Sequence, residues 1–97
     1  MSSKNLIPIQ TLCKHYKVET SFFTGLSEHG LIEVTTIAES NCIHQDHIQQ
    51  VEKMIRLHQD LHLNVEGIDT VLNLLQRIEQ LQSELQSAKR RLGIYEE

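Results

Sequence analysis

The side chains best suited to chemistry in this 97-residue chain are two histidine-containing clusters. Cys42, His44 and His47 offer three possible metal ligands in a short run, and His58 and His62 lie one helical turn apart. A zinc site needs four ligands, or three and an open position, held in tetrahedral geometry. Neither cluster has a second cysteine or an acidic pair spaced to complete such a set. We therefore interpret them as exposed histidines beside a buried thiol, and we predict no metal.

The amino-acid sequence also offers no candidate catalytic group. Cys13 and His15 are close in sequence, but side chains two positions apart on a helix do not face each other, and no third group orients the pair. The sequence has no glycine-rich phosphate loop and no carboxylate pair in an evident cleft. We predict a protein that is not an enzyme, with no catalytic residue and no cofactor.

Charge is distributed unevenly along the chain. The net charge is −4, and residues 18–52 contain no lysine or arginine, although six acids fall there: Glu19, Glu28, Glu33, Glu39, Asp46 and Glu52. A protein that binds nucleic acid needs cations on its docking face. Two cysteines, no secretory signal pattern and no long apolar run predict a reduced, cytoplasmic protein.

The elements that position these residues begin with two short helices. The spacing of Ile9 and Leu12, after Pro8, predicts a helix over residues 9–16. Thr20 is expected to cap a second helix, and Gly30 follows it where a helix commonly ends in a left-handed residue. Two helices joined by a tight turn form a helix-turn-helix. Phe22 and Phe23 are expected in its core, although either ring could anchor an interface if exposed.

The next segment predicts a small wing. Apolar residues 31–37 are expected to form one strand, residues 38–41 a turn, and Cys42-Ile43 a second short strand. A helix is predicted from about Gln45 to His62. Asn64 is then expected to cap a long helix that runs from about Val65 to Leu92.

This last helix carries an apolar seam with heptad spacing. The seam residues are spaced alternately three and four apart, which is typical of a coiled coil, and they are Val71, Leu74, Ile78, Leu81, Leu85, Ala88 and Leu92. A second stripe of Ile68, Leu72 and Leu75 fits packing against the helix-turn-helix. Because no other segment is long enough to cover the seam, we predict an antiparallel homodimer. Residues 1–63 and 64–97 are the expected parts of one structural domain.

Two stretches resemble known families. IPIQTLCKHYKVETSFFTGLSEHGLI is similar to the opening of MerR-type winged helix-turn-helix proteins, but it lacks their arginine in the second helix and their basic wing. IRLHQDLHLNVEGIDTVLNLLQRIEQLQSELQ resembles the chaperone-modulator CbpM family, through Asn64-x-x-Gly67-Ile68 and the leucines that follow it. The fold class that follows is all-α, a MerR-like winged helix-turn-helix with a two-strand wing and a long C-terminal dimerisation helix.

The CbpM resemblance implies a function. Members bind the J-domain of the DnaJ-like co-chaperone CbpA and restrain its stimulation of the Hsp70 DnaK. J-domains present a basic helix to Hsp70, and an acidic helix-turn-helix face would compete for it. The expected partner contacts are Glu19, Glu28, His29 and Glu33. The alternative is a MerR-family DNA-binding transcriptional regulator, which the shape favours and the charge opposes.

Overall fold

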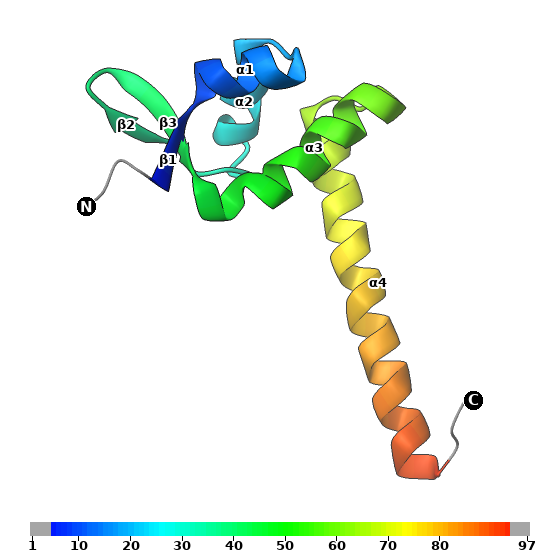
Figure 1. Ribbon diagram of the computed structural model, residues 1–97. Coiled ribbons are helices and arrows are strands. Elements are labelled where there is room, and N and C mark those ends of the chain that lie inside the picture. The colour runs from blue at the N-terminus through cyan, green and yellow to red at the C-terminus, as the bar shows by residue number, and fades with distance from the viewer. Residues whose placement is uncertain (1–4, 94–97) are drawn as a thin grey trace.

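The computed structural model describes residues 5–93 and shows a compact head from which one long helix projects (Figure 1). The chain extends over 57 × 34 × 23 Å. The helices are α1 (Ile9–Tyr16), α2 (Thr20–Glu28), α3 (Ile48–Leu61) and α4 (Val65–Leu92), and the strands are β1 (Leu6–Pro8), β2 (Thr35–Ile37) and β3 (Ser40–His44). Among the residues described, no helix is long and apolar enough to cross a membrane.

Helices α1 and α2 form the predicted helix-turn-helix, with the first helix at the bounds expected. Lys17 ends α1 in the left-handed region at a φ of 59°, and its backbone N–H donates to the Cys13 carbonyl. The expected cap at Thr20 is wrong by one residue: Glu19 is the N-cap, and it makes no side-chain capping bond. Thr20 is the first helical residue, and Phe22, Phe23 and Leu26 are all buried as expected.

The wing differs from the two-strand expectation, because a third strand completes the sheet. Its order is β1-β3-β2, and both pairs are antiparallel. Ile7 of β1 lies opposite Ile43 of β3. Pro8, which has no N–H to donate, is tolerated because β1 is an edge strand. The wing, defined from here as β2, β3 and their turn, is thus tied to the start of α1.

The predicted strand over residues 31–37 is also too long. Only Thr35–Ile37 pairs with β3, whereas residues 31–34 form a loop. Leu31, Ile32 and Val34 pack against the head core from this loop. Burial therefore explains their apolar character without strand pairing. Gly30 has a φ of 74°, as its position after α2 predicts.

Helix α3 joins the sheet to the rest of the head. It is preceded by a 3-10 turn, η2 (Gln45–His47), so the helix expected from Gln45 begins three residues later. The Tyr16 hydroxyl donates a hydrogen bond to Glu52, and this bond, burial and the Glu52 charge raise the pKa of Tyr16. Gln59 donates to the Tyr16 carbonyl across 2.7 Å. These bonds hold α1 against α3.

Helix α4 is anchored in the head by its first turns. The Asn64 side chain caps the helix as predicted, since its Oδ1 accepts from the Gly67 N–H at 2.8 Å. Ile68 is fully buried in the same cluster as Leu26 and Ile55. A Cβ on Gly25 would lie 3.0 Å from Val65 Cγ2, so glycine there lets α2 approach α4 closely.

Candidate protein-interaction surface

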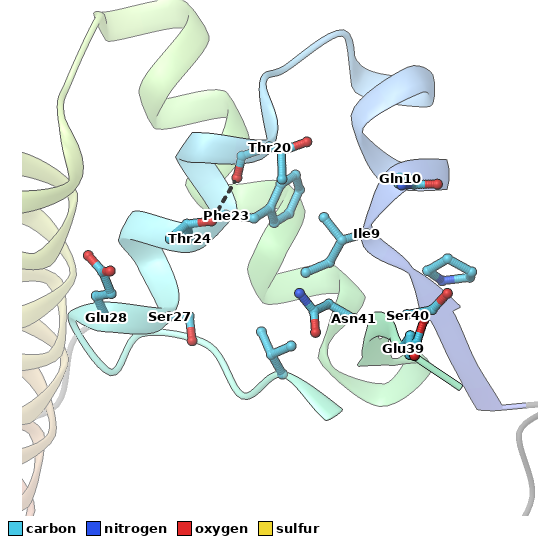
Figure 2. A pocket seen from close by; sticks show the side chains of 12 residues that line it. Ile9, Gln10, Thr20, Phe23, Thr24, Ser27, Glu28, Glu39, Ser40 and Asn41 are labelled. Atoms are coloured by element: carbon cyan, nitrogen blue, oxygen red, sulfur yellow. Dashed lines mark hydrogen bonds between the residues drawn. The ribbon is translucent and has the colours of Figure 1, made fainter. Parts of the chain in front are cut away.

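A groove of about 280 Å³ lies between the exposed side of α2 and the wing (Figure 2). Its floor is apolar, because Ile9, Phe23 and Val34 line it, and the two larger side chains are buried. Its remaining lining is mostly polar and comes from the start of α1, from α2 and from the wing: Pro8, Gln10, Thr20, Thr24, Ser27, Glu28, Glu39, Ser40 and Asn41. We call this the α2–wing groove.

Two carboxylates stand on opposite sides of the α2–wing groove. Glu28 is the last residue of α2, and Glu39 lies in the turn between β2 and β3 (Figure 2). Both are exposed. None of the twelve residues that line the groove is lysine, arginine or histidine. The groove therefore suits a ligand that brings positive charge or hydrogen-bond donors. The same charge makes the groove unfavourable for phosphate.

Polar side chains between the two acids are already partly oriented. Asn41 Oδ1 accepts from the Thr36 hydroxyl at 2.9 Å, which holds the amide of Asn41 within the wing. The Thr24 hydroxyl donates to the Thr20 carbonyl at 3.3 Å, one turn earlier on α2. The hydroxyl oxygen of Thr24 and the free amide N–H groups of Asn41 keep hydrogen-bonding capacity for a ligand.

The predicted partner contacts do not form one continuous site. All four are exposed, but Glu19 and Glu28 lie at opposite ends of α2, about 13 Å apart along a helix of that length. Glu19 lines a separate hollow beside Phe22 and His58, and Glu33 lines another beside α3. The His29 ring lies against the Gly25 carbonyl, with Nδ1 at 3.3 Å. Only Glu28 belongs to the α2–wing groove.

Glu39 is an acidic residue of the groove that the sequence did not predict as a partner contact. The sequence showed Glu39 only as one of the six acids in residues 18–52, because nothing in the local sequence predicts that the wing lies beside α2. Ala38 and Glu39 occupy left-handed conformations, at φ 51° and 66°. This two-residue hairpin turn normally takes asparagine and glycine. The turn therefore holds a carboxylate at the groove at a cost in backbone energy.

The two histidine clusters lie away from the α2–wing groove. The rings of His44 and His47 are 5.9 Å apart, and His44 Nδ1 accepts from the Asp46 N–H. Cys42 is buried, and its thiol lies 3.8 Å from the Ser40 carbonyl. Within residues 5–93, no three His, Cys, Asp or Glu side chains gather where they could hold a metal ion.

The second pair of histidines is used in packing. His58 stacks on Phe22 at 4.4 Å between ring centroids, and its Nδ1–H donates to the Leu63 carbonyl at 2.8 Å. His62 ends α3 in a left-handed conformation at φ 56°. These contacts give both residues a structural role at the corner between α3 and α4.

A second surface without a partner lies along α4. The large seam residues Leu74, Ile78, Leu81, Leu85 and Leu92 are between 49% and 73% exposed. Val71 and Ala88 are half-buried. The neighbouring stripe is covered only in part, since Ile68 is buried and Leu72 half-buried, but Leu75 is 41% exposed. An exposed apolar stripe of this length is unusual on a monomeric protein.

Comparison with known proteins identifies what the chain is similar to. The family model described as MerR HTH family regulatory protein matches residues 7–90. The chaperone modulatory protein CbpM of Pseudomonas putida is 34% identical over 96 residues, which is 96% of this chain and 95% of that protein. The protein of the same name from Pseudomonas entomophila is 31% identical over the same shares. No solved structure matches the chain.

The strained turn of the wing yields a stability prediction. Ala38→Asn should raise the free energy of unfolding by about 0.5–1 kcal/mol, because asparagine tolerates the left-handed conformation better than alanine. Gly30→Ala is the matched control: its φ is also positive and nothing lies within 4 Å of a Cβ there, so it should cost about 1 kcal/mol. Urea unfolding measures both. A loss of stability in Ala38→Asn would contradict a strained turn.

Proposed function

Since the chain belongs to the MerR HTH regulatory protein family, and within it to the CbpM chaperone modulators, we propose that it binds the J-domain of a DnaJ-like co-chaperone. Binding would restrain that co-chaperone from stimulating its Hsp70 partner. The role is non-enzymatic and cytoplasmic in this proposal. The general role of chaperone modulator rests on the names of the relatives, and the J-domain as target is the finer inference.

The observation that carries this proposal is the chemistry of the α2–wing groove. J-domains of the type implied by the CbpM resemblance present a basic helix to Hsp70. Glu28 and Glu39 stand on either side of a groove whose floor is apolar and whose lining has no cation. A basic, amphipathic helix complements that surface in charge and in polarity. Such complementarity speeds encounter and makes binding depend on salt.

The same groove weakens the DNA-binding alternative. In helix-turn-helix regulators the second helix enters the major groove and is held by phosphate contacts from cations. Here the exposed side of α2 carries Thr20, Thr24 and Ser27, with Glu28 at its end. Residues 18–52, which include Glu28, contain six acids and no lysine or arginine. The family match supports the shape, but this surface repels phosphate.

We further propose that the exposed seam of α4 pairs with a second copy. The spacing of the seam favours an antiparallel register with Leu81 near the two-fold axis, because each seam residue then faces a seam residue of the second copy. Val71 would lie opposite Leu92 of the second copy, Leu74 opposite Ala88, and Ile78 opposite Leu85. Each leucine removed from water in this way stabilises the dimer by about 1.5–3 kcal/mol at full burial.

Reversing charge at the groove tests the partner surface. Glu28→Lys together with Glu39→Lys should weaken binding to the J-domain of a CbpA-type co-chaperone by about tenfold at low salt, since both carboxylates would become repulsive. Glu66→Lys together with Glu84→Lys is the control, because it changes the net charge equally on exposed positions of α4. Isothermal titration calorimetry measures both. Equal affinity for the two double variants would remove the groove from the proposal.

A mobility-shift assay on duplex DNA accompanies that titration. The wild-type chain should leave random and operator-like duplexes unshifted at about 50 mM salt, where non-specific binding through cations is strong. Tight, sequence-specific retardation would favour the regulator instead and would overturn the ranking of the two functions.

The seam is tested by introducing a charge into it. Leu81→Lys or Leu85→Lys should give monomers, because a buried lysine would have to lose its hydration within the pair. Gln82→Lys, an exposed neighbour outside the seam, should stay dimeric. Light scattering after size-exclusion chromatography gives the mass directly. Dimers in both leucine variants would show that another surface mediates association.

A further inference from the structure

His44 ends β3 at the point where the sheet passes into η2 and α3 (Figure 1). It is the N-cap of η2, and its ring nitrogen Nδ1 accepts the backbone N–H of Asp46 at 3.0 Å. A neutral imidazole has one nitrogen that donates and one that accepts. Because Nδ1 is the acceptor here, the neutral ring carries its proton on Nε2. The cap therefore exists only while the ring is neutral.

The same ring has a second contact available on the same residue. An oxygen of the Asp46 carboxylate lies 3.6 Å from His44 Nδ1. A protonated ring carries hydrogen on both nitrogens, so it can donate to this carboxylate but can no longer accept the backbone N–H. The two side chains are 39% and 83% exposed, so water reaches the ring and the carboxylate has room to turn toward it. One proton thus selects between two mutually exclusive contacts.

Few other titratable groups face this ring within residues 5–93. The ring of His47 lies 5.9 Å from that of His44, between centroids, and two charged rings would repel each other. Strands β1 and β2, which flank β3, carry no titratable side chain. On β3 itself Cys42 is buried. Helix α1, which packs on β3, has basic residues only in its last turn, Lys14 and His15. The acid and the imidazole of η2 are therefore the groups that act on His44.

We propose that His44 is a pH-dependent latch between the wing and α3. At neutral pH its ring caps η2 and holds the turn Gln45–His47 at the end of β3. In mild acid, where histidine is the ordinary side chain that gains charge, the ring turns to the Asp46 carboxylate. The cap is then lost and the junction loosens. None of these contacts lines the α2–wing groove, so the latch does not depend on the proposed function.

Nuclear magnetic resonance on the ¹⁵N-labelled chain tests the hydrogen bond itself. At about pH 8 the His44 ring should carry its proton on Nε2, and a scalar coupling should join Nδ1 to the amide nitrogen of Asp46. At about pH 5.5 this coupling should be lost. Both measurements use the wild-type chain alone, so they do not require any variant to fold.

Two variants identify the group that responds to pH. His44→Asn keeps the cap closed, because the asparagine Oδ1 accepts the same N–H and does not titrate. At the lower pH the amides of η2 and of the first turn of α3 should exchange about fivefold faster in the wild type than in His44→Asn, since one helix cap contributes about that factor. At the higher pH the two rates should agree. His47→Gln is the matched control and should keep the wild-type response.

Three results would overturn the latch. A proton on Nδ1 at the higher pH would mean that the cap does not exist. Exchange that responds to pH in His44→Asn as it does in the wild type would assign the response to another group. Loss of the response in His47→Gln would make His47 the sensor.

Discussion

The burial of Ile68 in the head core is the contact on which the rest of the structure depends. Ile68 lies in the first turns of α4 and packs in the same cluster as Leu26 of α2 and Ile55 of α3. Burying such a side chain contributes about 1.5–3 kcal/mol. Because Asn64 caps the helix just before it, this contact fixes both where α4 begins and where it leaves the head. The exposure of the seam follows from that exit.

The shape and the charge of the α2–wing groove come from different parts of the head. The helix-turn-helix and wing supply a rigid groove whose floor is part of the core, since Phe23 is fully buried beneath it. The turn that carries Glu39 adopts a strained left-handed backbone, and this turn places a carboxylate on the side of the groove opposite Glu28. A fold that matches the MerR HTH regulatory protein family thereby offers an acidic surface, and we propose that this surface recognises a polypeptide.

The sequence predicted the helices well, because their signals are local. Periodic apolar residues set the bounds of α1 and α4, and Asn64 and Gly30 marked helix ends correctly. It missed β1, since a three-residue edge strand has no period and pairs with a partner far along the chain. It mistook residues 31–34 for a strand, because core packing and strand pairing both favour apolar side chains. The sequence also could not predict that Glu39 of the wing lines the same groove as Glu28 of α2, because this placement depends on the tertiary fold.

The surface that contacts the partner can be mapped residue by residue on the uniformly ¹⁵N-labelled chain. Titration with the J-domain of a CbpA-type co-chaperone should shift the backbone amide signals of α2 and of the wing, Thr20–Glu28 and residues 35–44. The signals of residues 76–86 on α4 should stay in place. Shifts confined to α4 or to the corner between α3 and α4, with those of α2 and the wing unchanged, would contradict the assignment of the α2–wing groove as the binding surface.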